Sequence, residues 1–280
     1  MAGMIERIAP LVRSLLAPNP SPFTYTGTQV FIVGEGEVAV IDPGPDDPGH
    51  IETLVRGLAG ERVAAILCTH THRDHSPASL ALQAATGAPI VGCAALALKG
   101  EEDRADEAFD AEYRPDRVLG DGETLAGAGW TLEAVATPGH TSNHLCFALR
   151  ETETLFSGDH VMGWSTSIVA PPDGDMTAYM ASLDKVAARD DRVYFPTHGP
   201  AIEDPQEHVA RLIAHRQGRE NQILAHLGRG AARISEMVQH MYREVHPGLH
   251  PAAALSVLAH LRDLEGRGLV RSEGDAWVRA

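Results

Sequence analysis

Residues 63–75 read VAAILCTHTHRDH, an apolar run that passes directly into a cluster of ligand-type side chains. The run Val63–Cys68 predicts a strand covered on both faces, because such strands are continuously apolar rather than alternating. In the loop after it, His70 and His72 point the same way from an extended segment and can share one metal ion. Asp74 and His75, at the turn into a helix, face a second ion. Neutral imidazoles and a carboxylate suit zinc best, and the same set also accepts manganese or iron.

Three further ligand-type residues stand in turns of small residues at the ends of other predicted strands. They are His140 in TPGHT (137–141), Asp159 in FSGDH (156–160) and His198 in PTHG (196–199). Because a metal centre needs more ligands than one loop supplies, these three residues are candidates to complete it.

The rest of the first 200 residues predicts a mixture of strands and helices. Two β-rich runs, 29–33 and 37–41, flank Gly34-Glu35-Gly36 and predict a hairpin. Helical patterns cover 51–58, 77–85 and 177–188, and 101–115 is a charged connection with poor periodicity. Further short strands are predicted at 89–93, 117–119, 124–125, 130–136, 144–149, 154–156 and 193–196.

From Pro205 the pattern changes. Three helical patterns cover 208–227, 234–242 and 251–265, and the runs 268–272 and 276–279 flank Glu273-Gly274-Asp275 as a small hairpin. Helices followed by a two-stranded wing predict a winged helix of roughly 75 residues. We therefore expect two domains, 1–203 and 204–280.

The ligand blocks, in this order, resemble the metallo-β-lactamase superfamily of dinuclear metal hydrolases over residues 20–200. The resemblance implies an α/β fold, the αββα sandwich of two packed mixed sheets flanked by helices. The C-terminal winged helix narrows the resemblance to the branch of β-lactamase-like proteins with that domain, which includes endoribonucleases and is similar to thioesterases acting on carrier-bound acyl chains. The resemblance also implies the ligands: His70, His72 and His140 for the first metal, Asp74, His75 and His198 for the second, and Asp159 as the bridge.

Two zinc ions held in this way would make a bridging hydroxide nucleophilic at neutral pH, so no serine or cysteine nucleophile is needed. Asp74 is the candidate catalytic residue that orients the hydroxide and shuttles its proton. Asp42 ends a strand where the superfamily keeps a carboxylate that orients a ligand histidine. His144 and His160 lie beside ligand blocks. Each of them either supports a metal ligand through a hydrogen bond or has a purely structural role. Two interpretations of the segment 163–168 stay open. It borders the substrate together with Tyr179, or it is a loop packed by Trp164.

The formal net charge is −15, and it is distributed unevenly. Residues 1–203 have a balance of −16 and residues 204–280 a balance of +1. An acidic catalytic portion repels a polyanion, because nucleic-acid affinity depends on basic residues that neutralise phosphates. The balance therefore favours a small-molecule acyl substrate, although Arg211, Arg216 and Arg219 could form a local basic patch.

Three functions remain open at this point. The first is hydrolysis of a carboxylic ester, thioester or lactone, and the second is metal-dependent cleavage of single-stranded RNA, which would make nucleic acid the partner. The third, a non-catalytic binding protein, conflicts with the presence of all seven ligand-type residues. For the winged helix we expect a role as a lid or as a contact in a homodimer, since its last helix has only Arg262 as a basic side chain.

The sequence predicts a cytoplasmic protein. Glu6, Arg7, Pro10 and Arg13 interrupt the N-terminal apolar segment, which is therefore a poor signal peptide, and no apolar run is long enough for a membrane span. The three cysteines are too few and too scattered for a disulfide framework and are expected in the core.

Overall fold

The structure is a computed structural model that describes residues 3–96 and 108–280. The chain divides into two compact units. The first consists of Met1–Thr137, Asn143–Thr166 and Arg189–Pro205, and the second of Pro138–Ser142, Ser167–Ala188 and Gln206–Ala280. The C-terminal segment of the second unit thus begins two residues after the expected start of the second domain. The domains 1–203 and 204–280 stay a prediction.

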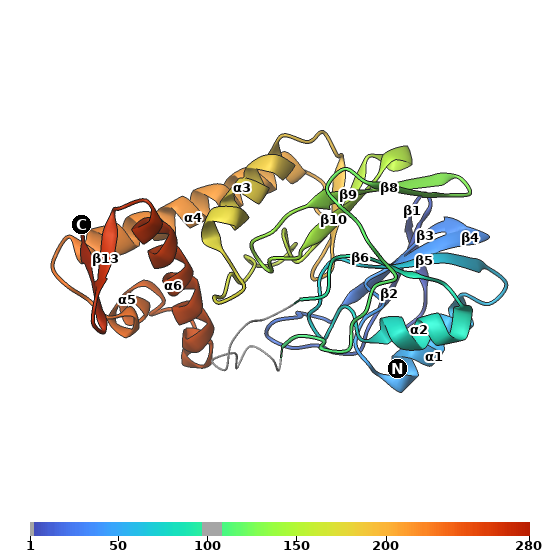
Figure 1. Ribbon diagram of the computed structural model, residues 1–280, viewed down its shortest axis with the longest axis horizontal. Coiled ribbons are helices and arrows are strands. Elements are labelled where there is room, and N and C mark those ends of the chain that lie inside the picture. The colour runs from blue at the N-terminus through green and yellow to red at the C-terminus, as the bar shows by residue number, and fades with distance from the viewer. Residues whose placement is uncertain (1–2, 97–107) are drawn as a thin grey trace. The chain divides into compact units, whose positions relative to one another are not determined.

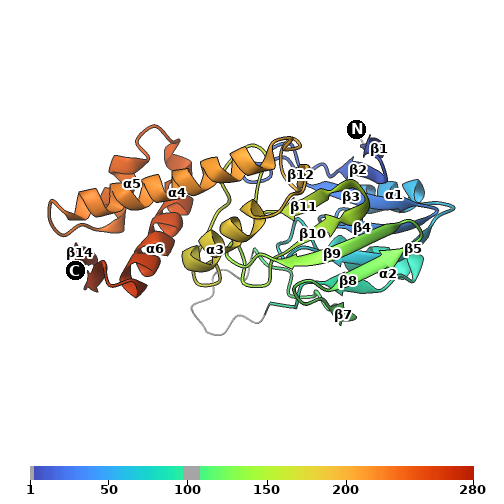
Figure 2. The same ribbon diagram turned by 90° about the horizontal axis from the view of Figure 1, so that it is seen from above.

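Two mixed sheets build the first unit (Figure 1). The larger has seven strands in sequential order, parallel from β4 onward: β1 (Glu6–Ala9), β2 (Val12–Leu16), β3 (Gln29–Glu35), β4 (Glu37–Ile41), β5 (Arg62–Cys68), β6 (Ile90–Gly92) and β7 (Arg117–Val118). Figure 2 shows the smaller sheet, in the order β12 (Val193–Pro196), β11 (Thr154–Gly158), β10 (Leu145–Leu149), β9 (Trp130–Ala136) and β8 (Thr124–Gly127). Only β11 and β12 are parallel in it.

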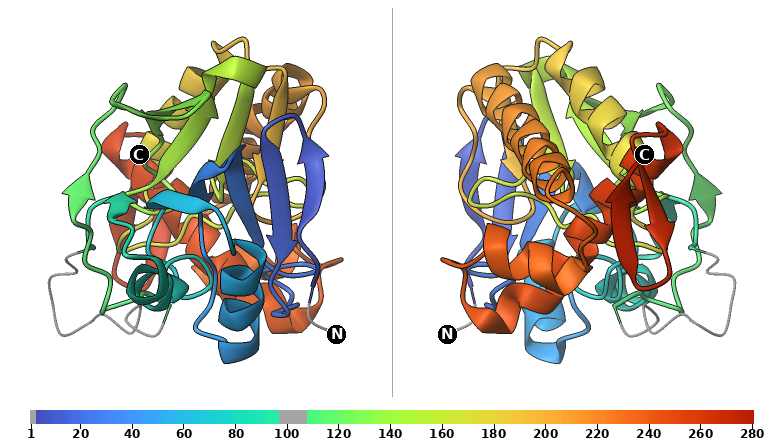
Figure 3. Two further views of the ribbon diagram at one scale, coloured as in Figure 1. Left: turned by 90° about the vertical axis from the view of Figure 1, so that its right-hand side faces the viewer. Right: turned by 90° about the vertical axis from the view of Figure 1, so that its left-hand side faces the viewer.

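The two sheets share one apolar core. The Phe31 ring of β3 lies 5.0 Å from that of Phe156 on β11 and 6.0 Å from that of Phe195 on β12. Helices α1 (Pro48–Gly57) and α2 (Ala78–Thr86) add Leu54 and Leu82 to the same core and lie beside the larger sheet (Figure 3, left). The result is a sandwich whose strand ends are held rigidly by packing on both sides.

The strands next to the loop 69–75, which carries the first four predicted ligands, were predicted well, and those at the N-terminus were not. β5 is buried along nearly its whole length, as its continuous apolar run predicts, and the 29–41 hairpin is confirmed as β3 and β4. The β1–β2 hairpin was missed. Its strands are joined through Leu11, which adopts a φ of 61°, and a leucine in the left-handed region gives no turn signal in the sequence.

The second unit is helical apart from one hairpin. It contains α3 (Met176–Ala187), most of α4 (Pro205–Leu227), α5 (Ile234–Met241), α6 (His250–Gly266), β13 (Val270–Glu273) and β14 (Ala276–Arg279). Leu227, Met237, Val257 and Trp277 meet in its own core. The helices and the terminal hairpin confirm the predicted winged helix (Figure 3, right).

Part of the predicted connection 101–115 lies outside the described residues. The described remainder runs along the loop 69–75. The N–H of Arg73 donates to the carbonyl of Ala108, and the N–H of Asp110 donates to the carbonyl of Thr71. Among the helices of the described chain, none is both long and apolar enough to span a bilayer.

Candidate metal centre

The predicted ligands follow strands whose ends lie at one edge of each sheet. β4 and β5 run parallel, so Asp42 and the loop beginning at Thr69 leave the larger sheet together. β11 and β12 run parallel in the smaller sheet, where Asp159 and His198 follow them. Since parallel neighbours end at the same edge, residues distant in sequence become neighbours in space.

All seven predicted ligands fall into two groups. His70, His72, His140 and Asp159 form the first, and Asp74, His75 and His198 form the second; within each group one ligand atom per residue lies within 4.8 Å of the others. His140 sits in the segment Pro138–Ser142, and both residues that flank this segment belong to the first unit.

Asp159 adjoins both groups. It is a member of the first, and its Oδ1 lies 3.6 Å from Nε2 of His75 and 3.4 Å from Nε2 of His198 in the second. Nε2 of His198 also lies 3.1 Å from Oδ2 of Asp74. A carboxylate between two sets of imidazoles is therefore in the position from which it could contact two ions.

Four of the histidines use Nδ1 for a hydrogen bond to the protein, which makes Nε2 the nitrogen turned toward its group. The partners of Nδ1 are Thr69 Oγ1 at 3.0 Å for His70, Asp42 at 2.9 Å for His75, the Ile168 carbonyl at 2.6 Å for His140 and the Gly27 carbonyl at 3.2 Å for His198. Such a bond sets the tautomer and the ring orientation of a metal-binding imidazole.

The donor set fits a divalent metal. Nε2 of His75 is buried and has no hydrogen-bond partner, although His75 is completely inaccessible to solvent. A buried polar atom without a partner is costly unless a ligand satisfies it. Imidazole and carboxylate donors suit zinc, manganese or iron, so the residues present match a pair of such ions.

Charges within the second group are strongly coupled. Burial lowers the pKa of His75, but the carboxylates of Asp74, Asp159 and Asp42 outweigh it and raise the pKa well above its usual value. Burial also lowers the pKa of His198, but the carboxylates of Asp159 and Asp74 outweigh burial, so this pKa is raised as well. Burial raises the pKa of Asp74, but the charge of His75 and a hydrogen bond from His198 outweigh burial and lower this pKa below its usual value. The carboxylate of Asp74 is thus ionised, and its negative charge attracts cations to the site.

Asp42 is fully buried behind the second group, as its predicted supporting role requires. Its carboxylate accepts hydrogen bonds from Nδ1 of His75, from the N–H and Oγ1 of Thr69 and from Oγ1 of Thr197. The two threonines were missed by sequence reasoning. Each directly precedes a ligand-type histidine, and this adjacency is the signal that could have identified them.

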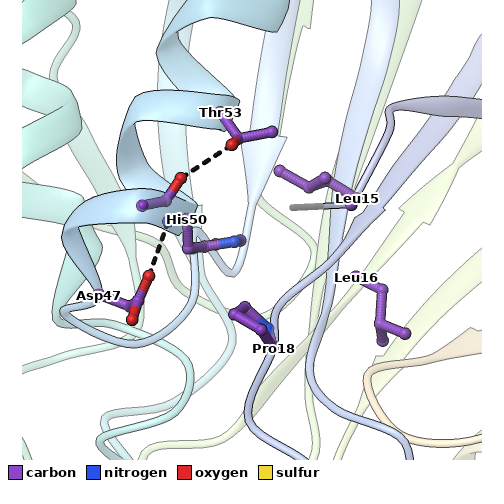
Figure 4. A pocket seen from close by; sticks show the side chains of 8 residues that line it. Leu15, Leu16, Pro18, Asp47, His50 and Thr53 are labelled. Atoms are coloured by element: carbon purple, nitrogen blue, oxygen red, sulfur yellow. Dashed lines mark hydrogen bonds between the residues drawn. The ribbon is translucent and has the colours of Figure 1, made fainter. Parts of the chain in front are cut away.

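A small pocket lies beside the start of α1 (Figure 4). Its His50 ring hydrogen-bonds the Pro43 carbonyl at 2.9 Å, and Asp47 caps α1 by accepting from the N–H of His50. Asp42 itself has a φ of 48°, a conformation that few side chains tolerate. These hydrogen bonds hold the turn after Asp42, and the lining of the pocket contains none of the seven grouped residues.

His144 joins neither group and supports Asp159 instead. Its Nε2 accepts from the N–H of Asp159 at 3.1 Å, and its Nδ1 is 2.8 Å from Oγ1 of Thr137. Gly158 has a φ of 53°, and a Cβ there would lie 2.6 Å from Nε2 of His144. His160 is buried with its ring 6.2 Å from that of His144, and it too lies outside both groups.

An exposed aromatic pair joins the loop after β11 to the loop between β2 and β3. The rings of Tyr25 and Trp164 stack at 5.0 Å between centroids, and their side chains remain 47% and 37% exposed. The N–H of Gly163 donates to the carbonyl of His198 at 3.2 Å, which places this pair beside the second group. Tyr179, in contrast, is completely buried, so the expectation that it borders a substrate is wrong for this conformation.

The three arginines that could have formed a basic patch do not form one. Arg216 is only 3% exposed, and Arg211 lies 3.8 Å from Glu207. Arg219 is half-buried with its guanidinium 4.2 Å from the centre of the Tyr242 ring. These side chains therefore present no continuous surface to a nucleic-acid backbone.

Comparisons with known proteins agree with this geometry. Residues 24–198 match the metallo-beta-lactamase superfamily, and residues 234–277 match the beta-lactamase associated winged helix domain. The chain is 34% identical over 79% of its length to an atrochrysone carboxyl ACP thioesterase of Aspergillus fumigatus, and the match covers 66% of that protein. It is 32% identical over 95% of its length to a beta-lactamase-like protein 2 homolog of Drosophila melanogaster, 92% of which is covered.

Solved structures show the same architecture. A metallo-beta-lactamase family protein from Thermus thermophilus superimposes with a TM-score of 0.80 at 25% identity, covering 98% of this chain and 100% of that one. A beta-lactamase domain protein from Burkholderia ambifaria superimposes with a TM-score of 0.84 at 22% identity. That match covers 100% of this chain and 94% of the Burkholderia chain. The chain belongs to the metallo-beta-lactamase superfamily of hydrolases and has the associated winged helix domain in its C-terminal part.

Proposed function

We propose that this hydrolase cleaves thioesters of acyl substrates at a centre of two zinc ions. The observation that carries the proposal is the position of Asp159, within 4.8 Å of the first group and 3.4–3.6 Å from two imidazoles of the second. His70, His72 and His140 would hold one ion and Asp74, His75 and His198 the other, with Asp159 between them. When bound, the ions would acidify a water molecule and polarise the substrate carbonyl.

Asp74 is the residue that would handle the proton of the attacking water. Its side chain is 26% exposed, and its Oδ2 accepts a hydrogen bond from Oγ1 of Thr28 at 3.3 Å. Because its pKa is lowered, it is an ionised acceptor at neutral pH and can orient the water for attack. A thiolate is a good leaving group, since a free thiol has a pKa of about 8.5, so no strong general acid is required.

The choice of a thioester is supported by the surface beside the second group and by one relative. The stacked Tyr25–Trp164 pair offers an apolar face to an acyl chain, and the arginines of α4 offer no path for a polyanion. The Aspergillus fumigatus relative is named an atrochrysone carboxyl ACP thioesterase. An acyl thioester therefore fits this site better than single-stranded RNA.

The test is a paired assay with metal analysis. We expect the zinc-loaded protein to contain two equivalents of metal and to hydrolyse a panel of acyl thioesters. Asp159→Ala should lose at least one equivalent and reduce the rate by at least about 100-fold, because it removes the carboxylate shared by both groups. Asp46→Ala, which removes an exposed carboxylate of the same unit, is the control and should change neither.

The same preparations distinguish the competing functions. Retention of both metals and of full activity by the Asp159→Ala protein would contradict the proposed centre. Cleavage of labelled single-stranded RNA that disappears in that variant, with no thioester turnover by the wild type, would replace the acyl substrate by a nucleic acid.

A further inference from the structure

The segment that holds His140 is tied down residue by residue within the second unit. The Asp175 N–H donates to the Gly139 carbonyl at 2.9 Å, and Ser182 Oγ donates to the Pro138 carbonyl at 2.8 Å. A Cβ on Gly139 would lie 2.3 Å from Cα of Tyr179, so only glycine permits this contact. His140 is therefore presented by the residues around α3 rather than by a free loop.

Arg216 of α4 is connected to the same segment through two consecutive carbonyl groups. Nη2 of Arg216 donates a short hydrogen bond to the carbonyl of Ser167. The next carbonyl, that of Ile168, accepts the hydrogen bond from Nδ1 of His140 at 2.6 Å. The two carbonyl groups belong to adjacent peptide units, which are joined at Cα of Ile168.

The environment of Arg216 is unusual for a charged side chain. It is 3% exposed, its guanidinium carbon lies 5.1 Å from the centre of the Tyr179 ring, and its Nε has no hydrogen-bond partner. Across residues 3–96 and 108–280, no carboxylate lies within ion-pair distance of it. Burial of an unpaired charge is costly, so the hydrogen bond to the Ser167 carbonyl and the contact with the Tyr179 ring are what stabilise the buried guanidinium.

We propose that Arg216 is a positioning residue for the metal ligand His140. By fixing the 167–168 peptide, it keeps the Ile168 carbonyl in place as the acceptor for Nδ1–H of His140, and Nε2 stays directed to the first group. The helix that leads into the winged helix domain thereby controls how tightly the first metal is held. This inference rests on the proposed function, in which His140 binds a metal.

The test measures metal affinity separately at the two groups, by competition with a chromophoric zinc chelator. We expect Arg216→Met to weaken one zinc site by about 10- to 100-fold and to leave the other unchanged. Arg211→Met is the matched control, because Arg211 lies on the same helix but is exposed and contacts only Glu207 at the edge of ion-pair distance. It should bind both ions as the wild type does.

A second readout does not depend on metal. In the metal-free protein, the Nδ1–H of His140 should give a slowly exchanging imidazole proton resonance, which Arg216→Met should broaden or remove. Arg216→Lys retains one donor for the Ser167 carbonyl and should lose less affinity than the methionine variant. If Arg216→Met fails to fold, Arg216→Gln carries the test, because its shorter side chain stays polar but cannot reach the Ser167 carbonyl. Wild-type zinc affinity with an unchanged resonance in that variant would overturn the proposal.

The outcomes separate this inference from the proposed function. If His140→Ala leaves two tight zinc sites, or if the wild type binds fewer than two ions, the proposed dinuclear centre fails. If His140→Ala abolishes one site while Arg216→Met retains both sites and the resonance, the dinuclear centre stands and only the positioning role fails.

Discussion

Asp42 shows how much of the site depends on one residue outside both ligand groups. Its buried carboxylate receives four hydrogen bonds, one of them from Nδ1 of His75. An amide in its place would offer one acceptor oxygen and leave buried donors unsatisfied. Asparagine also tolerates the positive φ of this position, so the substitution changes the chemistry without straining the backbone.

We therefore expect Asp42→Asn to weaken zinc binding by about 10- to 100-fold and to lower the free energy of unfolding by about 1–3 kcal/mol. Chelator competition and urea unfolding measure the two effects. Asp46→Asn, at an exposed neighbouring position, is the control. Wild-type zinc affinity in the Asp42→Asn protein would show that the carboxylate does not orient His75.

Trp164 allows a test of the substrate surface. If its exposed ring contacts the acyl chain, Trp164→Ala should raise KM for a long-chain acyl thioester by roughly 10-fold, equivalent to about 1.4 kcal/mol of lost binding. The value of kcat, and the kinetics with an acetyl thioester, should change little. Leu255→Ala, which removes an exposed apolar side chain of α6, is the control. An equal effect on long and short substrates would argue against an acyl-binding surface at the Tyr25–Trp164 pair.

At the scale of elements, α6 carries a buried histidine that makes the second unit sensitive to acid. Burial, followed by the charges of Arg216, His215, Arg219 and Arg267, lowers the pKa of His260 to about 3. In the unfolded chain this pKa is about 6.5, so between these values the unfolded state binds the proton and the folded state does not. Stability therefore decreases as the pH falls below about 6.5.

His260→Leu should remove this dependence. At pH 5 the histidine costs about 2 kcal/mol relative to pH 7, because the pH is then roughly 1.5 units below the unfolded pKa. Urea unfolding at both pH values, followed by a probe in the second unit, should show a smaller difference for the variant. His240→Gln, at an exposed position of α5, should behave as the wild type. If the pH dependence of the His260→Leu protein matched that of the wild type, His260 would not be its source.

The elements also show where local patterns predict structure. β5 and the helices of the winged helix have strong periodicity or continuous apolar runs, and each was predicted close to its observed bounds. β1 has a largely exposed face and is joined to β2 through Leu11, so neither periodicity nor turn chemistry marks it. Pairing with β3, through β2, stabilises this hairpin instead.

For the whole molecule, metal binding should contribute to folding stability. Nε2 of His75 is buried without a hydrogen-bond partner, so in the metal-free protein this atom is an energetic cost to the fold. A ligand that binds only the folded state at 1,000 times its Kd stabilises it by about 4 kcal/mol. We expect chelator treatment to lower the melting temperature and re-added zinc to restore it.

Differential scanning calorimetry of the wild type with and without chelator measures this effect, and Asp159→Ala serves as the comparison. Its melting temperature should respond less to zinc. An unchanged melting temperature after complete removal of metal from the wild type would contradict the expected coupling between metal binding and folding.

The sequence by itself determined the ligand types, their grouping along the chain and the winged helix. These follow from local features, namely a histidine-rich loop after a buried strand and helical periodicity after Pro205, and local features are recorded in neighbouring residues. The sequence also pointed to Asp42 as a supporting residue, but only the tertiary structure decided which contacts that support makes. Thr197 and Asp42 are 155 residues apart yet share a hydrogen bond, and Arg216 on α4 reaches the carbonyl of Ser167, which lies 49 residues earlier in the chain and outside the helices. Such contacts depend on how distant segments pack, and no pattern of adjacent residues encodes that packing.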